Sequence, residues 1–436
     1  MNTDYSSALM EFGALVDERT GVIRRVELVK NSPSDPDVFM AYAEPCDTSA
    51  LAGIAAANKG AACSPSRDRA LIRACGESIE RYCSAFFRNI ERAYASYAEL
   101  SAAGSDYVPV EALYPFGSSV NADGFPYDLT EGRSIAWVQA TSTRTGGLTL
   151  VPASCVYTPY LFDRGVEPFT HMPISTGLAA QRSTEEATDK GILEILERDA
   201  FMIIWHNRMP VPRISTSSCL GIDPLIDRLL AAESPSGPTW HLNLLTLDVD
   251  VPIISAALID PGDPPRTSFG MAANADPQRA LLLALEEAAL TRVLINRSRV
   301  QPIVGEPRSH TVRTLRDHLN VHASSQVLRS RLGFLTDDGP QLTFGEVRSR
   351  FPTGGVSVSS TLHRAGLEAF WVDITTEDVA DFGFRVVRSV VPQAQPLDND
   401  HRYRYMGGSR VYTVPARLGY RHIQLADLNP DPHPFP

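Results

Sequence analysis

The run Glu-x-x-Glu-Arg occurs twice in this sequence, at residues 77–81 and 194–198. A spacing of three places both carboxylates of one copy on the same face of a helix, about one turn apart. The arginine that follows is rotated by roughly 100° and therefore flanks the carboxylate pair. Two such helices facing each other would form a cage of oxygen ligands bordered by guanidinium groups. Mg²⁺ prefers oxygen ligands and guanidinium groups bind phosphate, so the doubled run predicts a site for a Mg²⁺-nucleotide.

The surroundings of the two runs decide how this pattern is interpreted. Either run alone is more typical of a solvated helix face held by ion pairs between neighbouring turns. The second run, however, lies within the almost wholly apolar segment ILEILERDAFMIIW at residues 192–205. A helix that is apolar on nearly every side is expected to be buried, and buried carboxylates need partners. Two unit charges about 4 Å apart repel by roughly 4 kcal/mol at an effective dielectric constant near 20, so converging carboxylates call for a metal ion.

The composition is typical of a soluble globular protein, with 436 residues of which 43% are hydrophobic and 21% charged. The net charge of −11 argues against nucleic acid or an anionic membrane surface as the main partner. We find no signal peptide and no run of 18 apolar residues, and the six cysteines show no metal-binding spacing. A cytoplasmic protein with free thiols is therefore expected. No Walker A sequence is present, so nucleotide binding is not expected to be of the P-loop type.

Hydrophobic periodicity and turn residues predict alternating helices and strands, so the fold class is α/β or α+β. We expect long helices at residues 70–100, 183–206 and 276–297. A strand–turn–strand is expected at 15–29, and further strands are expected at 135–139, 148–157, 242–259, 368–374 and 383–391. The predicted organisation is an N-terminal strand and loop segment at 1–50, a catalytic core at 51–429 and a proline-rich tail at 430–436.

Four segments of the sequence resemble the YcaO family. The most specific is STGLAAQRSTEEATDKGILEILERDAF at residues 175–201, which combines Gly-Leu-Ala-Ala, Glu-Glu-Ala and Glu-x-x-Glu-Arg-Asp-Ala. The others are ALIRACGESIERYCSAFF at 70–87, FGMAANADPQRALLLALEEAALTR at 269–292 and DFGFRVVRSVVPQAQPL at 381–397. The resemblance extends from about residue 15 to the end of the chain.

The resemblance implies a YcaO fold, in which mixed sheets and three long helices form an ATP and Mg²⁺ site without a P-loop. Members of the family activate backbone amides of peptides. By position, the metal ligands would be Glu77, Glu80, Glu186 and Glu197. The residues that would contact the nucleotide are Arg81, Arg198, Glu194, Glu287, Arg292 and Lys59.

Some positions depart from the family pattern. Leu283 stands where an arginine is usual, Leu290 where a glutamine is common, and Arg73 where a serine is frequent. Losing a guanidinium at position 283 would remove a charge-assisted phosphate contact of about 1.5–3 kcal/mol. The candidates for compensation are Arg182, Arg279 and Arg292.

The C-terminal residues Pro432-His-Pro434-Phe-Pro436 resemble the tail of azoline-forming cyclodehydratases of ribosomally made peptides. Without the resemblance, a frayed tail is the simpler interpretation. With it, the tail is expected to reach the active site, where the carboxylate of Pro436 or the imidazole of His433 would accept or orient a proton.

The activity implied is ATP-dependent cyclodehydration of Cys, Ser or Thr residues in a precursor peptide, through phosphorylation of the backbone amide oxygen. Expected partners are the precursor peptide, an E1-like protein that binds the leader peptide, a flavin-dependent azoline dehydrogenase and a second copy of this chain. Two alternatives stay open: a YcaO enzyme that forms thioamides or amidines, and a scaffold subunit without catalysis.

Overall fold

The computed structural model describes residues 12–29, 35–56, 59–87, 92–129, 132–163, 165–234, 237–262, 266–298, 303, 305–337, 339–352 and 357–435. Within these ranges, no helix is long and apolar enough to cross a membrane.

Three separate sheets make up the strand framework. The first contains β1 (Ile23–Val29), β2 (Phe39–Pro45) and β3 (Gly60–Ser64), in that order. The second has the order β11 (Arg266–Ala273), β10 (Ile253–Asp260), β9 (Thr239–Leu244), β8 (Arg213–Ile214) and β12 (Gln341–Leu342). The third has the order β4 (Ala93–Ala95), β5 (Ile135–Ser142), β13 (Phe370–Asp373), β14 (Arg385–Val390) and β7 (Leu178–Gln181), with β6 (Leu148–Pro152) paired to β5. Neighbouring strands in the part of the chain that the structure describes run antiparallel, except that β8 and β12 run parallel. The fold is therefore of the α+β kind and contains a mixed sheet, in agreement with the fold class predicted from the sequence.

Three long helices lie among these sheets: α2 (Arg67–Cys83), α6 (Thr184–Asn207) and α8 (Pro277–Ser298). Each helix follows shortly after a strand, and the residue just before the helix caps its N-terminus. Ser66 and Ser183 accept hydrogen bonds from the first turns of α2 and α6, and Asp276 accepts one from Gln278 in the first turn of α8. These caps satisfy backbone N–H groups that have no partner inside the helix.

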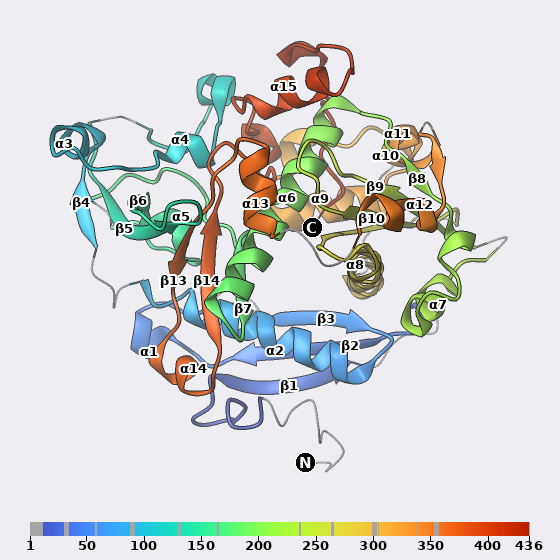
Figure 1. Ribbon diagram of the computed structural model, residues 1–436, viewed down its shortest axis with the longest axis horizontal. Helices are drawn as coiled ribbons and strands as arrows, with labels where there is room; N and C mark the ends of the chain where they lie inside the picture. The colour runs from blue at the N-terminus through green and yellow to red at the C-terminus, as the bar shows by residue number, and fades with distance from the viewer. Residues whose placement is uncertain are drawn as a thin grey trace.

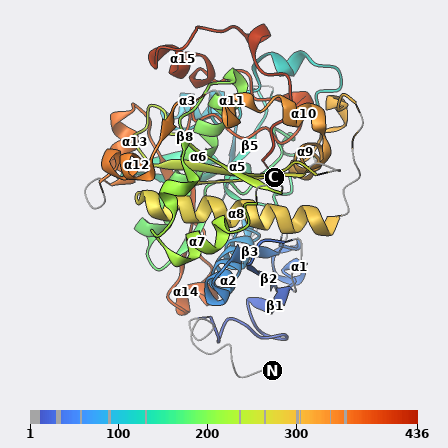
Figure 2. The same cartoon turned by 90° about the vertical axis from the view of Figure 1, so that its right-hand side faces the viewer.

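The three strand–helix units, β3–α2, β7–α6 and β11–α8, are arranged in a cycle. Each helix packs on its own sheet and also contacts the strand of the next unit, so that α2 meets β7, α6 meets β11 and α8 meets β3. Figure 1 shows α6 and α8 in the middle of the molecule, with α2 on the sheet of β1 to β3. Seen from the side in Figure 2, α8 crosses the centre of the molecule, with that sheet below it and most of the chain above it. Each of the three helices therefore bridges two of the sheets.

Glycine permits the close approach of strand and helix in two units. A Cβ atom on Gly60 would lie 2.1 Å from the carbonyl oxygen of Ala74 on α2, and one on Gly270 would lie 2.2 Å from the backbone nitrogen of Ala288 on α8. Any larger residue would therefore push the helix away from its strand.

Shorter helices fill the space between these units and at their edges. They are α1 (Ser49–Ala52), α3 (Tyr97–Ala102), α4 (Val110–Leu113), α5 (Ala153–Val156), α7 (Pro224–Leu230), α9 (Leu315–Ser324), α10 (Gln326–Ser330), α11 (Gly333–Thr336), α12 (Phe344–Arg350), α13 (Val358–Arg364), α14 (Glu377–Asp381) and α15 (Arg410–Arg417).

The predicted helix at 70–100 is wrong in its second half. Helix α2 ends at Cys83, and residues 93–95 and 97–102 form β4 and α3 instead. At the end of α2, the Ser84 hydroxyl donates to the carbonyl oxygen of Thr158 at 2.6 Å. This contact between distant segments has no signature in the local sequence. The predicted strand at 148–157 likewise ends at Pro152, where α5 begins.

Candidate functional site

One glutamate on each long helix is bound to a backbone N–H of the preceding strand segment. Glu77 accepts from Ala61 at 2.8 Å, and Glu287 accepts from Met271 at 3.0 Å. Glu194 accepts from Gly177, just before β7, at 3.0 Å. The acceptor follows its donor by 16, 16 and 17 residues, so the three units repeat one arrangement.

The second glutamate of each Glu-x-x-Glu-Arg run is bound to the next unit in the cycle. Glu80 on α2 accepts from the N–H of Ala180 on β7 at 2.8 Å. Glu197 on α6 accepts from the N–H of Ala273 on β11 at 3.1 Å. The two runs therefore lie where the units join, and their carboxylates converge on the interior from α2 and α6.

The arginines of both runs are enclosed by these carboxylates. Arg81 donates to Glu77 at 2.9 Å, and Arg198 forms ion pairs with Glu197 and, at 3.3 Å, with Glu194. Although burial disfavours a charged guanidinium, the surrounding carboxylates raise the pKa of both arginines above the ordinary value. Each arginine still has a buried Nε atom without a hydrogen-bond partner among the described residues.

Negative charge in this interior is only partly balanced. Burial raises the pKa of the Glu80, Glu197 and Glu287 carboxyls. Repulsion from neighbouring glutamates raises these pKa values further, and Glu194 acts in this way on both Glu197 and Glu287. Desolvation disfavours the charged form of a carboxyl, which a nearby cation restores. The site therefore has a deficit of positive charge that a bound divalent cation would supply.

The donor set fits Mg²⁺, because hard carboxylate oxygens converge and two largely enclosed arginines lie beside them. Among the described residues, no three His, Cys, Asp or Glu side chains are already grouped closely enough to hold a metal ion. The carboxylates contact arginine, lysine and backbone N–H groups instead. Loading the site with metal therefore requires some of these ion pairs to open.

Three residues expected at the site lie away from this cluster. Glu186 is exposed in the first turn of α6, where its backbone N–H donates to Ser183. Lys59 forms an exposed ion pair with Glu44 at 2.9 Å. Arg292 is buried against Asp260 at the end of β10, at 2.6 Å. Glu186 stands 11 residues before Glu197 on α6, or about three helical turns away, and its role as a metal ligand stays a prediction.

Four charged residues at the cluster were not expected from the sequence. Lys190 donates to Glu80 at 2.8 Å. Glu286 is fully buried and forms ion pairs with Arg69 at 2.7 Å and Arg73 at 2.6 Å. The sequence pattern that could have indicated two of them is their spacing, because Arg73 and Lys190 each stand four residues before the first glutamate of a Glu-x-x-Glu-Arg run.

The C-terminal tail is buried rather than frayed. Residues 431–435 are all buried, and Figure 1 shows this segment returning from α15 to the middle of the molecule. Side chains donate to four successive backbone carbonyls of the tail: His401 to Pro430, Trp205 to Asp431, His322 to Pro432 and His318 to His433. Because proline lacks an N–H group, the tail is held mainly through its carbonyl oxygens.

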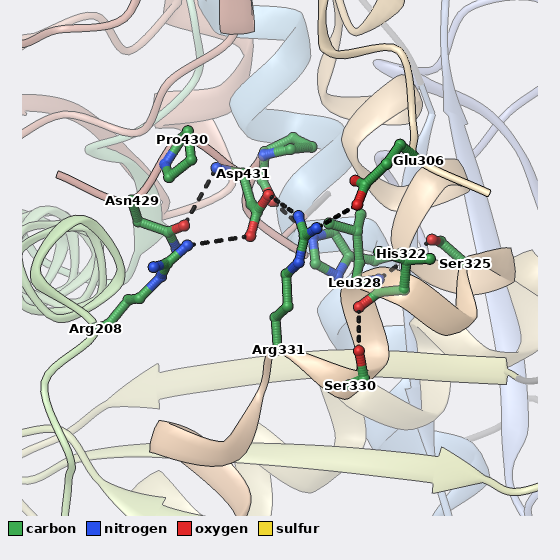
Figure 3. Close-up of polar contacts among 12 residues, drawn as sticks. Arg208, Glu306, His322, Ser325, Leu328, Ser330, Arg331, Asn429, Pro430 and Asp431 are labelled. Carbon is green, nitrogen blue, oxygen red and sulfur yellow. Dashed lines mark hydrogen bonds and ion pairs between the residues drawn. The ribbon is translucent and has the colours of Figure 1, made fainter. Parts of the chain in front are cut away.

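The Asp431 side chain fixes the start of this buried segment. Its carboxylate lies between Arg208 at 3.5 Å and Arg331 at 2.7 Å, and Arg331 also pairs with Glu306 (Figure 3). At the other end, Phe435 packs against Phe201, with its ring centroid 5.0 Å from the guanidinium carbon of Arg198. The tail thus reaches the arginine of the second run.

His433 and Pro436 were the expected proton acceptors. Pro436 lies outside the described residues. The His433 ring is buried, stacks on His318 with centroids 3.8 Å apart, and contacts the carbonyl oxygen of Asp398 through Nε2 at 2.7 Å. Burial lowers the pKa of His433 to about 3. In this structure His433 thus holds the tail and does not contact the carboxylate cluster.

A small cavity of about 50 Å³ adjoins Arg198. Its wall is mostly apolar, with Ile195, Val390 and Ala394 among the lining residues. Arg388 and Gln395 also line it, and both carry a buried polar atom that has no partner among the described residues. A cavity of this size and polarity is suited to one small polar group, such as an amide.

The model of the YcaO cyclodehydratase family, described as ATP- and Mg²⁺-binding, matches residues 61–395. An uncharacterized protein from Methanothermobacter thermautotrophicus (strain Delta H) is 27% identical over 425 residues, covering 95% of this chain and 97% of that protein. An uncharacterized protein in the tfuA 3′ region of Rhizobium leguminosarum bv. trifolii is 31% identical over 34% of this chain and 38% of its own length.

Several solved structures share the fold. A heterocyclase in complex with substrate and cofactor has a TM-score of 0.79 at 21% identity, and the heterocyclase TruD has 0.65 at 23%. These comparisons cover 98% and 84% of this chain, which spans only 57% and 51% of those chains. YcaO from Methanopyrus kandleri bound with AMPPCP and Mg²⁺ has a TM-score of 0.62 at 19% identity, with 89% of both chains covered.

Proposed function

Because this chain belongs to the YcaO family, whose members bind ATP and Mg²⁺, we propose that it is an ATP-dependent peptide cyclodehydratase. The observation that best supports this proposal is the pair of largely enclosed arginines, Arg81 and Arg198. Each is enclosed by the carboxylates of its own Glu-x-x-Glu-Arg run, and a cavity adjoins Arg198.

In the proposed reaction, a Cys, Ser or Thr side chain of a precursor peptide gives up its thiol or hydroxyl proton to a base and attacks the carbonyl carbon of the preceding amide. The amide oxygen takes the γ-phosphoryl group of ATP, which releases ADP. Loss of this oxygen as phosphate, with the nitrogen proton, leaves an azoline ring. The net change in the peptide is the loss of one water.

The chain's own residues would serve this reaction in three ways. Glu77, Glu80 and Glu197 would hold Mg²⁺, which neutralises the phosphate charge when bound. Arg81 and Arg198 would bind and orient the phosphates through their guanidinium groups. The cavity beside Arg198 would receive the reacting amide and exclude water from it, and Phe435 of the tail would fix the orientation of Arg198.

We further propose that the substrate peptide is delivered by a separate leader-binding partner. A chain of the E. coli microcin synthetase McbBCD complex with pro-MccB17 bound shares the fold at a TM-score of 0.56 and 14% identity, with 86% of it covered. A flavin-dependent dehydrogenase would then oxidise azolines to azoles. All six cysteines are free thiols, which favours the reducing cytoplasm as the place of action.

The test combines the purified chain with ATP, Mg²⁺, a precursor peptide encoded beside its gene, and the partner encoded there. ADP release together with the loss of one water's mass per ring is expected. A mass gain from exchange of oxygen for sulfur would instead indicate thioamide formation. ATP binding measured by calorimetry without any turnover would indicate a scaffold subunit, for which Leu283 and Leu290 are the motivating departures.

The partner is tested by comparing peptide affinity with and without it. We expect the isolated chain to bind the precursor weakly and the complex to bind it tightly. Full affinity of the isolated chain would remove the need for a partner.

A further inference from the structure

The threefold repeat of strand and helix allows the three helices to be compared position by position. Glu77, Glu194 and Glu287 occupy the same place in their units, because each accepts the N–H of its own strand segment. In each helix, three further positions face the same interior. They are the residue four positions before this glutamate, the residue three positions after it and the residue four positions after it. In α2 they are Arg73, Glu80 and Arg81; in α6, Lys190, Glu197 and Arg198; in α8, Leu283, Leu290 and Thr291.

At these four positions, helices α2 and α6 therefore present the same kind of charged set, whereas α8 carries a charge only at its central glutamate. Leu283 and Leu290 are half-buried and pack against the apolar cluster around Leu281 and Leu285. The positive charge of the site comes from the two helices that form the rest of the cycle.

The outer pair of cations, Arg73 and Lys190, differs from the inner pair in exposure. The side chains of Arg73 and Lys190 are 32% and 49% exposed, whereas those of Arg81 and Arg198 are 15% and 13% exposed. The outer cations can thus meet a ligand that arrives from solvent.

Buried carboxylates hold the outer pair in place. Glu286, fully buried on α8, binds Arg73 at 2.6 Å, and Glu80 binds Lys190 at 2.8 Å. Arg73 also interacts electrostatically with Lys190 and with Glu287, so these groups lie near one another. A phosphate group that arrives from solvent would meet both cations at the rim of the site, where each is held in place by its carboxylate.

We propose that Arg73 and Lys190 form a phosphate-binding pair at the mouth of this site and bind the outer phosphates of the nucleoside triphosphate. An arginine at position 283 would supply positive charge from α8, but this chain has a leucine there. Arg73 on α2 and Lys190 on α6 supply that charge instead. This inference rests on the proposed use of ATP as phosphoryl donor at the same site.

The test measures the affinities of a non-hydrolysable ATP analogue and of AMP, both with Mg²⁺, by calorimetry. Arg73→Ser and Lys190→Ala are each expected to weaken analogue binding about tenfold or more, as loss of one charge-assisted contact predicts, with little change for AMP. Arg69→Gln is the matched control, because Arg69 shares Glu286 but has no contact with Lys190 or Glu287 among those described. It is expected to change neither affinity by more than about twofold, because Gln keeps a hydrogen-bond donor near Glu286 and the other oxygen of Glu286 still binds Arg73.

A second-site variant makes the test sharper. Arg73→Ser combined with Leu283→Arg returns a guanidinium to the equivalent place on α8, and should regain at least half of the lost binding energy for the analogue. Melting temperatures show which variants fold. If Arg73→Ser does not fold, the affinities of Lys190→Ala alone decide the outcome.

Unchanged affinity of folded Arg73→Ser and Lys190→Ala for the analogue overturns the inference, as does an equal loss for AMP and the analogue. Failure of the proposed function looks different. In that case the wild-type chain binds the analogue, and the comparison of variants still holds, but no peptide loses water.

Discussion

Glu197 on α6 accepts a hydrogen bond from the backbone N–H of Ala273, at the end of β11, with a distance of 3.1 Å. The two residues belong to different strand–helix units, and their contact joins those units at the carboxylate cluster. Glu80 makes the equivalent contact with Ala180. These glutamates therefore hold the units together, and in the proposed function they would also provide oxygen atoms for a cation.

This double role predicts a loss of ligand binding that exceeds the loss of stability. Glu197→Gln keeps an acceptor for the Ala273 N–H but removes one charge, so Mg²⁺-nucleotide affinity should fall about tenfold or more. Peptide-dependent ADP release should fall with it, and Glu80→Gln should behave alike. Calorimetry and a coupled ADP assay measure both quantities.

Glu186→Gln provides the matched control on the same helix. Because Glu186 is exposed in the first turn of α6, this change should leave nucleotide affinity within about twofold. A loss as large as that of Glu197→Gln would return Glu186 to the set of metal ligands.

Nucleotide binding should weaken in acid. Burial raises the pKa of Glu80, Glu197 and Glu287, so these carboxyls take up protons at a higher pH than ordinary glutamates. Because their pKa is higher in the folded than in the unfolded state, these groups stabilise the ligand-free protein while they are protonated. That contribution to the free energy of unfolding is lost as the pH rises through the folded-state pKa. Mg²⁺ needs the ionised form, so the rise in melting temperature caused by Mg²⁺ and the ATP analogue should be larger at pH 8 than at pH 6. An equal rise at both values would contradict the protonation of these groups.

The histidines around the tail should make the protein sensitive to acid. Burial lowers the pKa of His322 and His401 to about 4 and that of His433 to about 3. Unfolded histidines take up protons near pH 6.5, so the stability from these groups is complete above that value and is lost as pH falls toward 4. The melting temperature should therefore drop steeply between pH 6.5 and 4.

Variants connect this pH dependence to the tail. His322→Asn loses the contact of 2.6 Å with the Pro432 carbonyl and should destabilise the protein by about 1–3 kcal/mol at neutral pH, while reducing the acid sensitivity. His422→Gln, which replaces an exposed histidine, should change neither. Limited proteolysis with mass spectrometry of the C-terminal peptide shows whether the tail is released at low pH.

The end of the tail should affect catalysis more than nucleotide binding. Phe435 is buried between Phe201 and the Arg198 guanidinium, so Phe435→Ala leaves a cavity that costs about 3–5 kcal/mol if the site does not collapse. We expect loss of cyclisation with nucleotide affinity kept within a few fold. Phe39→Ala, at an exposed position on β2, is the control. Unchanged cyclisation in folded Phe435→Ala would separate the tail from the reaction.

The sequence by itself determined the local part of this site. Helical periodicity places Glu77, Glu80 and Arg81 together on one face of α2, and the same rule applies to the second run on α6. Helix α6, and α8 with Glu287, lie close to where the pattern predicted them, and α2 begins close to its predicted start but ends at Cys83. Capping residues and a 3.6-residue period act over short distances and therefore fix these helix starts.

Only the tertiary structure decided which groups meet across segments far apart in the chain. Glu80 binds Lys190 across 110 positions, Arg73 binds Glu286 across 213, and Arg292 is taken by Asp260 instead of the site. The tail is buried because histidines and a tryptophan from separate helices donate to its carbonyl groups, which no local pattern encodes. Burial and partner choice depend on how the three units close into a cycle, and a single helix does not determine that packing.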